Sequence, residues 1–150
     1  MAQLSEKLKD KGFYKLGKIF YDKCDLEQAK TYFSKALKEF HEEQNWEGEL
    51  KVLGFLIRIY FEALELDKVS ELIQQSRTVL DSSPPNTKKA FYFYQLGCSY
   101  NYWDPNISKG SAEETRSKAT EAFITSYHEA LKEGDDELTA KALYNVANSY

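Results

Sequence analysis

The sequence has little of what metal centres, disulfide scaffolds and membrane spans are made from. Its 150 residues include two Cys, two His, three Pro and one Met. Cys24 and Cys98 are far apart in the chain and have no partner at metal-ligand spacing, so neither a zinc site nor a disulfide framework is predicted. No apolar run approaches the roughly 18 residues that a membrane-spanning helix needs, and residues 1–12 are too polar for a signal peptide. We therefore expect a cytoplasmic protein without a metal ion or a membrane partner.

An excess of basic charge is also absent. Lys and Arg number 20 against 24 Asp and Glu, which gives a net charge of −4 and a pI near 5.3. Because a nucleic-acid binder needs a basic face to neutralise phosphates, this balance argues against nucleic acid as a partner. The sequence lacks a P-loop, a dinucleotide fingerprint and a G-x-S-x-G motif. We expect no enzyme activity and no cofactor.

The chain instead carries a recurring pattern of apolar, small and aromatic residues at helical spacing. Three such groups belong to expected second helices of a pair: Ala29-Phe33-Ala36, Val69-Ile73-Ser76 and Ala119-Phe123-Ser126. Four belong to expected first helices: Leu16-Gly17-Phe20, Leu56-Ile57-Tyr60, Leu96-Gly97-Tyr100 and Val146-Ala147-Tyr150. The first three copies of the first-helix group are forty residues apart. In the third copy the second-helix group begins ten residues later than this spacing predicts, so ten additional residues lie between Tyr100 and Ala119. A register that continues after an insertion indicates a structural repeat.

This pattern resembles the L-G-x2-Y…A-x3-F signature of the tetratricopeptide repeat (TPR), and its long step resembles that of extended TPRs. The resemblance implies an all-α fold, an α-solenoid of antiparallel helix pairs with a right-handed superhelical twist and about seven helices. The repeats would cover approximately residues 10–44, 45–84 and 86–133, with an insertion at 103–112, followed by a half repeat at 136–150. Residues 1–150 would form a single domain.

Capping and breaking signals predict where these helices begin and end. Asp25, Asn45 and Asp67 are the expected N-caps of the second, third and fourth helices. Residues 81–86 include two prolines, which cannot continue a helix. The following helix is therefore expected to run from about residue 87 to residue 102.

The C-terminal helix leaves two alternatives open. Tyr150 holds the position at which Phe20 would pack against its own second helix, but no such helix follows in this sequence. The favoured alternative is that the chain is the N-terminal part of a longer protein. The other is that residues 136–150 themselves cap the array, with Leu143 and Val146 facing inward.

The resemblance to TPRs also implies a concave groove lined by the first helices. Once the repeated groups are assigned to the core, the opposite faces of these helices present aromatic, basic and amide side chains, and also Gly54. The candidate partner-binding residues are Lys11, Tyr14, Lys18, Tyr21, Lys51, Arg58, Phe61, Tyr94, Asn101, Tyr144 and Asn148. Tyrosine offers a stiff apolar contact with a polar tip, and asparagine can pair with an extended backbone.

Basic residues outnumber acidic ones on this expected surface, and Lys141 adds to them. Such a surface favours an acidic segment or a C-terminal carboxylate of a protein or peptide. The aromatic members have an alternative role, since Tyr14 and Tyr94 could pack only on neighbouring repeats.

Two functions are consistent with these features. The first is an interaction scaffold that binds a protein or peptide in the groove. The second is a regulatory or sensory domain of a larger signalling protein, which would act through an output domain after residue 150 or as a homodimer formed by the C-terminal helix. A natural stop codon directly after Tyr150 would count against the output domain.

Overall fold

The computed structural model describes residues 12–101 and 112–148, of which 85% are helical and none is in a strand. The all-α prediction is confirmed. Lys11 and all but the last residue of the predicted insertion lie outside the described residues. The helices are α2 (Gly12–Asp22), α3 (Leu26–Glu42), α4 (Trp46–Glu62), α5 (Leu66–Ser82), α6 (Ala90–Tyr100), α7 (Ala112–Glu133) and α8 (Asp136–Asn148).

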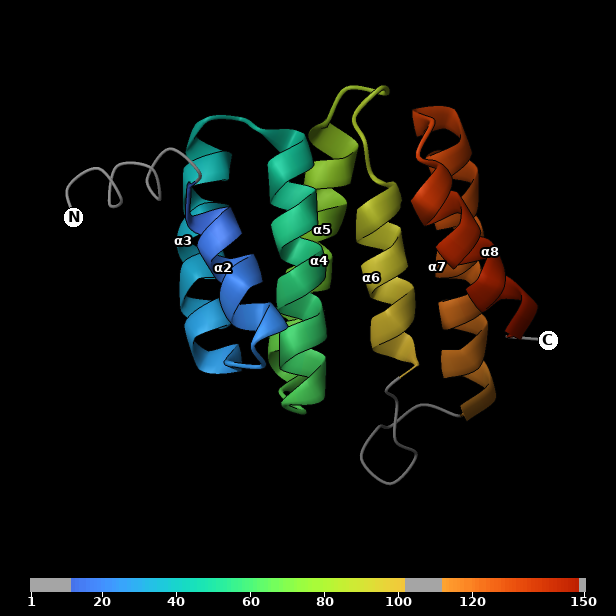
Figure 1. The fold of residues 1–150 in the computed structure, drawn as a ribbon, viewed down its shortest axis with the longest axis horizontal. Coiled ribbons are helices and arrows are strands. Elements are labelled where there is room, and N and C mark those ends of the chain that lie inside the picture. Colours follow the sequence, from blue (N-terminus) through green and yellow to red (C-terminus); the bar gives the residue numbers. More distant parts are fainter. Residues whose placement is uncertain (1–11, 102–111, 149–150) are drawn as a thin grey trace.

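The helices form two layers (Figure 1). In that view α2, α4, α6 and α8 lie in front, and α3, α5 and α7 lie behind them. Short turns at residues 23–25, 43–45, 63–65 and 134–135 reverse the chain and carry it from one layer to the other. The front layer therefore consists of the helices that the sequence predicts as the first of each pair.

The four short turns share one backbone geometry. The left-handed residues are Cys24 (φ 62°), Gln44 (φ 55°), Leu64 (φ 61°) and Gly134 (φ 72°). In each turn the next N–H donates to a carbonyl five residues back, as Asp25 does to Phe20 at 2.9 Å, which closes a Schellman motif. Because the first three turns recur every twenty residues, a pair of helices recurs every forty.

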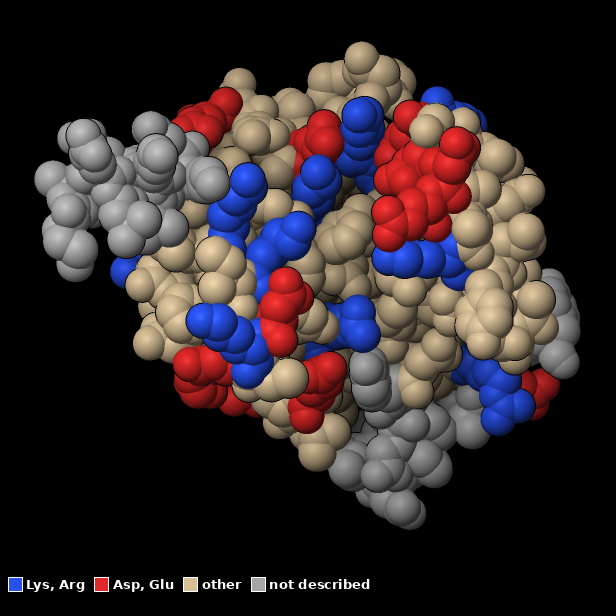
Figure 2. All heavy atoms as spheres, viewed as in Figure 1, with Lys and Arg blue, Asp and Glu red and all other residues tan. Residues whose placement is uncertain are grey.

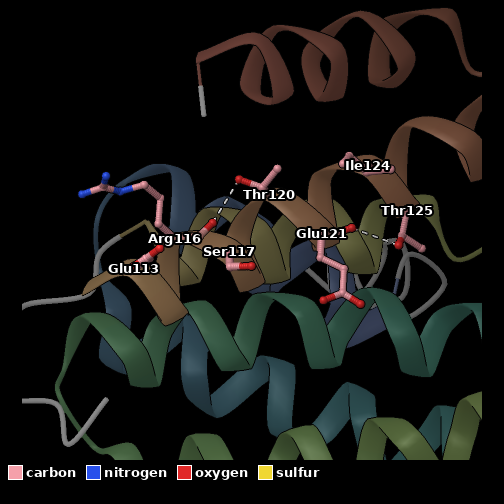
Figure 3. A pocket seen from close by; sticks show the side chains of 7 residues that line it. All are labelled: Glu113, Arg116, Ser117, Thr120, Glu121, Ile124 and Thr125. Atoms are coloured by element: carbon pink, nitrogen blue, oxygen red, sulfur yellow. Dashed lines mark hydrogen bonds between the residues drawn. The ribbon is translucent and has the colours of Figure 1, made fainter. Parts of the chain in front are cut away.

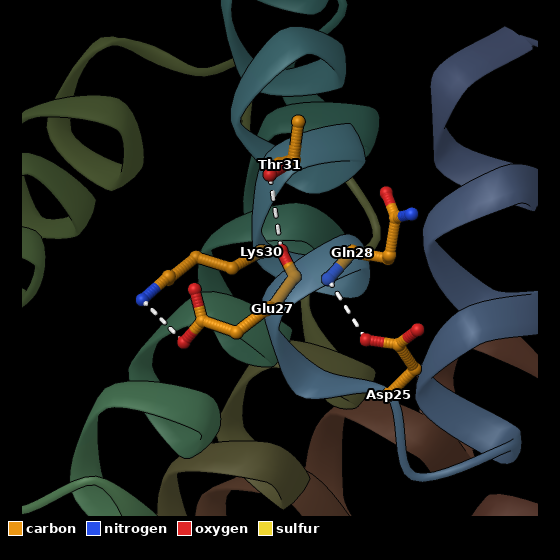
Figure 4. A network of polar contacts seen from close by, with 5 residues as sticks. All are labelled: Asp25, Glu27, Gln28, Lys30 and Thr31. Carbon is orange, nitrogen blue, oxygen red and sulfur yellow. Dashed lines mark hydrogen bonds and ion pairs between the residues drawn. The ribbon is translucent and has the colours of Figure 1, made fainter.

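The residue after each left-handed position is the N-cap of the next helix. Asp25 Oδ1 accepts a hydrogen bond of 3.2 Å from the N–H three residues on (Figure 4), and Asn45 Oδ1 accepts one of 2.9 Å. The predicted caps at Asp25 and Asn45 are confirmed. The prediction for Asp67 is wrong, because the twenty-residue spacing of the turns puts Glu65 at the cap of α5, without a side-chain capping bond. Asp67 lies in the first turn, where its charge favours the helix dipole.

Two glycines let the front helices approach their partners in the rear layer. A Cβ on Gly17 would lie 2.6 Å from the ring of Phe33, and one on Gly97 would lie 2.7 Å from the ring of Phe123. Both phenylalanines are fully buried. The small and large members of the repeated pattern thus fill one space together, and the buried Ile57 replaces the glycine in the second pair.

The start of α6 is attached to α7. Glu133 Oε2 accepts hydrogen bonds from the N–H groups of Lys89 and Ala90 at 3.0 and 3.1 Å, so the end of α7 caps α6. Ser126 Oγ donates to the Ala90 carbonyl oxygen at 2.8 Å in a buried position. These bonds fix the start of α6 at Ala90, three residues after the predicted start, while α5 continues to residue 82 despite the predicted break at 81.

The connection between α5 and α6 differs from the other described turns. It occupies residues 83–89 and includes a turn in which the Thr87 N–H donates to the Pro84 carbonyl oxygen at 3.0 Å. Helix α4 packs closely against α3, α5 and α6, whereas the backbones of α5 and α6 come close at almost no position. Departure from the three-residue turn thus coincides with a separation of these two helices.

The outer edge of α7 and α8 carries exposed apolar side chains. Leu138 and Ala142 are buried, but Leu143 is 51% exposed, so its predicted inward position in a capping helix is wrong. Val146 is half-buried. Leu131, at the end of α7, is 53% exposed.

The left-handed turn residues generate a test of local backbone energetics. We expect Leu64→Gly to raise the free energy of unfolding by about 0.5–1 kcal/mol, because the left-handed conformation disfavours residues with a Cβ and Leu64 is half exposed. Gly134→Ala is the matched opposite change. It should lower the free energy by about 1 kcal/mol, since no atom lies within 4 Å of the added Cβ and only the backbone cost remains. Urea unfolding measures both, and a loss of stability in Leu64→Gly would contradict this account.

Candidate functional site

Basic side chains gather on the face formed by the front layer. Figure 2, viewed as Figure 1, shows Lys and Arg over α2 and α4 and beside the acidic start of α8. Of the predicted basic residues, Lys18 lies on α2 and is exposed, whereas Lys51 and Arg58 lie on α4 and are half-buried. Lys141 lies on α8 and is exposed. In the same view acidic side chains lie among these basic ones, so the face carries charges of both signs.

Arg58 is held at the contact between α4 and α6. Its Nη1 donates a hydrogen bond of 2.8 Å to Oε1 of Gln95, which is only 3% exposed. A Cβ on Gly54, one turn earlier in α4, would lie 3.0 Å from the Gln95 Cβ. Gly54 is therefore buried in the helix contact, and the prediction that it faces an open groove is wrong.

Tyr94 and Cys98 lie on α6 between basic residues of two other helices. Burial raises the pKa of the Cys98 thiol, while the charges of Arg58 and Lys141 and a hydrogen bond with Tyr94 oppose this rise. Burial also raises the pKa of Tyr94, again against the charges of Lys141 and Arg58. Both groups therefore stay protonated at neutral pH. The hydrogen bond between them raises the pKa of Tyr94 and lowers that of Cys98, so the Tyr94 hydroxyl is its donor. The charges of two cations on other helices thus act on one phenol and one thiol of α6, and we call these four residues the α4–α6–α8 cluster: Arg58, Tyr94, Cys98 and Lys141.

Three other predicted residues take part in packing between helices. The rings of Tyr14 and Tyr21 contact Phe55 of α4, with centroids 6.1 and 5.1 Å apart. Burial is the main cause that raises the pKa of Tyr14 to about 12. Phe61 is 8% exposed, and its ring centroid lies 5.8 Å from that of Tyr100. Tyr14 thus has the packing contacts that the sequence left as an alternative, and Phe61 does not face an open groove as predicted.

The remaining predicted residues are not members of the cluster. Lys18 lies over the Tyr14 ring at 5.7 Å, and Lys51 Nζ lies 3.4 Å from Oε1 of Glu47 on the same helix. The other three are exposed, and Tyr144 is 69% exposed on α8. These are Asn101, Tyr144 and Asn148.

The partner-binding residues predicted from the sequence do not include Cys98, Gln95 or Glu133, and the buried position of Gln95 had a detectable signal. Gln95 lies forty residues after Phe55, so the repeat register places it at a buried position in spite of its polar side chain. The role of Glu133 in capping α6 had no such signal, because its partners lie more than forty residues away in the sequence.

Two hollows elsewhere hold less convergent chemistry. One of about 480 Å³ lies along α7, and all of its labelled lining residues belong to that helix (Figure 3). Its Thr120 and Thr125 hydroxyls donate to carbonyl oxygens of the same helix, at Arg116 and Glu121. Another hollow, of about 310 Å³, lies at the start of α4 beside Tyr14. The hollow along α7 is formed by that helix alone. The hollow beside Tyr14 joins residues of α2, α3 and α4, but its Lys51 is paired with Glu47 at 3.4 Å, which offsets its positive charge.

The described part of the chain shows neither a candidate metal site nor a candidate membrane span. No group of three or more His, Cys, Asp or Glu is arranged to hold a metal ion. Among the helices at 12–101 and 112–148, none is long and apolar enough to cross a membrane. No family model matches the chain, and no curated protein matches it.

Proposed function

We propose that this chain is a TPR-like interaction module that binds an acidic segment of a partner protein at the α4–α6–α8 cluster. The observation that carries the proposal is that the charges of Arg58 on α4 and Lys141 on α8 both act on Tyr94 and Cys98 of α6. Two cations from different helices thus act on one region of the front layer, on a protein with an excess of acidic residues. A carboxylate is the common protein group that accepts hydrogen bonds from both arginine and lysine.

The solenoid part of the proposal is supported by repeated local geometry. The first three left-handed turns recur every twenty residues, and Gly17–Phe33 and Gly97–Phe123 pack alike in the first and third helix pairs. A repeat that buries its apolar face only against its neighbours gives a two-layered stack, with one layer available for a ligand. The cluster lies on helices of one layer, as a concave groove requires.

The electrostatics of the cluster favour exchange of one carboxylate for another. Lys141 Nζ lies 3.0 Å from Glu137 Oε1, and both side chains are mostly exposed. Exposed ion pairs contribute about 0–1 kcal/mol, so a ligand carboxylate can replace Glu137 at little cost. Arg58 differs, since its bond to the buried Gln95 fixes its position before a ligand arrives. A preorganised guanidinium loses less entropy on binding.

Charge reversal in the cluster tests the proposed function. The probe is a fluorescein-labelled peptide of alternating Asp and Gly, and fluorescence anisotropy gives its Kd. We expect Lys141→Glu to weaken binding by about tenfold or more, and Arg58→Glu to abolish it, because each replaces an attraction with a repulsion. Arg58 is half-buried, so circular dichroism is needed to show that the Arg58→Glu variant remains folded. Lys141 is exposed, so the Lys141→Glu variant tests the proposal even if Arg58→Glu unfolds the protein.

The matched control is Lys132→Glu, which makes the same charge change at an exposed position on α7. Its affinity for the peptide should change less than twofold. An equal loss in Lys132→Glu and Lys141→Glu would show a general charge effect and refute the cluster as the site. Equal affinity for a peptide with Asn in place of Asp would refute recognition of carboxylates.

A second function is favoured by the exposed leucines at the α7–α8 edge. Leu131 and Leu143 are each about half exposed, and exposed apolar patches often mark protein contacts. A regulatory or sensory TPR domain would use this edge to form a homodimer or to contact an output domain after residue 150.

Light scattering over a concentration series tests the homodimer. This candidate predicts a mass of twice 17.4 kDa at high concentration, and the monomer mass for Leu143→Ser at the same concentration. Leu64→Ser removes an equally exposed leucine at a turn and should leave the dimer intact. A monomer at every concentration would contradict dimerisation.

A further inference from the structure

A hollow of about 310 Å³ lies between α5 and α7, with residues of α6 as its floor. Its lining is mainly apolar and aromatic, and side chains of α5, α6 and α7 contribute to it. Ile73 and Leu80 belong to α5, and Phe93, Leu96 and Tyr100 belong to α6. All five are only half-buried. We call this hollow the α5–α7 groove. Its size lies at the lower end of the range for small-molecule sites, roughly 300–1,000 Å³.

The groove exists because α6 is held by α4 and α7 and stands away from α5. Glu133 and Ser126 of α7 bind the first residues of α6, and the linker at 83–89 replaces a tight turn. Without close backbone approach between α5 and α6, apolar side chains of both helices remain partly open to solvent. This exposure costs stability in the absence of a ligand, which is typical of a binding site.

The charges at the groove favour an anion beside Arg77. Arg77 is exposed, and the groove also includes Lys118 and Glu121. Lys118 Nζ lies 3.9 Å from Oε1 of Glu114 on its own helix, which offsets its charge. Burial raises the pKa of the Tyr100 hydroxyl, and the charge of Arg77 opposes this more strongly than that of Glu121 supports it. Arg77 is therefore a cation whose charge acts at the Tyr100 hydroxyl.

We propose that the α5–α7 groove binds a small anionic amphiphile, with its apolar body over Phe93 and Leu96 and its carboxylate or sulfonate group at Arg77. The apolar lining supplies the binding energy by removing surface from water. The guanidinium supplies selectivity, since it forms charge-assisted hydrogen bonds with a planar anion. This site lies on the rear layer and is separate from the cluster that we propose for acidic peptides.

Displacement of a dye measures binding in the groove. Anilinonaphthalene sulfonate, an aromatic dye with one sulfonate, becomes fluorescent in apolar sites. Decanoate and the uncharged decanol, which has the same chain length, compete for the dye on the full chain. We expect Arg77→Gln to weaken decanoate binding by about tenfold, the value of one charge-assisted contact, and to change decanol binding less than twofold.

Three further variants keep the result interpretable. Arg116→Gln removes an exposed arginine on the outer side of α7 and should change neither ligand. Ile73→Trp places a large ring in the groove and should abolish dye binding, while circular dichroism remains that of the unaltered protein. Lys141→Glu, at an exposed position of the peptide site, should leave decanoate binding unchanged, which distinguishes this site from the peptide site.

Three outcomes would overturn the proposal. One is the absence of saturable displacement of the dye by decanoate on the unaltered protein. Another is an equal effect of Arg77→Gln and Arg116→Gln, which would indicate a general charge effect. The third is undiminished dye binding in folded Ile73→Trp, which would place the dye elsewhere on the surface.

Discussion

The close approach of α4 and α6 at Gly54 and Gln95 is the contact on which both proposed sites depend. The missing side chain of Gly54 admits Gln95, and the buried Gln95 amide oxygen then binds Arg58 at 2.8 Å. This contact connects α2–α5 with α6–α8, because α5 gives α6 almost no close backbone approach. It also holds Arg58 where its charge acts on Tyr94 and Cys98, the other members of the α4–α6–α8 cluster being on α6 and α8.

The same position of α6 has opposite effects on the two layers. In front, α6 lies against α4 and near α8, so that basic side chains from both sides converge on it. Behind, α6 stands away from α5, and the apolar α5–α7 groove remains between the rear helices. Glu133 and Ser126 maintain this position by binding the first residues of α6. The position of α6 therefore accounts for the two surfaces that we propose as binding sites.

The sequence predicted the helices and caps well where local spacing determines them, as at Asp25 and Asn45. The sequence prediction for Asp67 was wrong because an aspartate near a helix start can be either the N-cap or a residue of the first turn. Only the geometry of the preceding turn shows that Glu65 is the N-cap and that Asp67 lies in the first turn. Assignment of helix faces failed at Gly54 and Phe61, where contacts with α6 bury residues that a single helix pair would expose. Such contacts depend on how repeats stack, which the pattern within one repeat does not determine.

The most direct test of the account is a map of backbone amide chemical shifts by NMR during titration with the acidic peptide. The account predicts shifts centred on three front helices, near Arg58 of α4, Tyr94 of α6 and Lys141 of α8. It also predicts that residues of α3 and α5 remain unchanged, because they belong to the rear layer (Figure 1). Shifts centred on the rear helices, or the absence of shifts at every peptide concentration, would contradict the central claim.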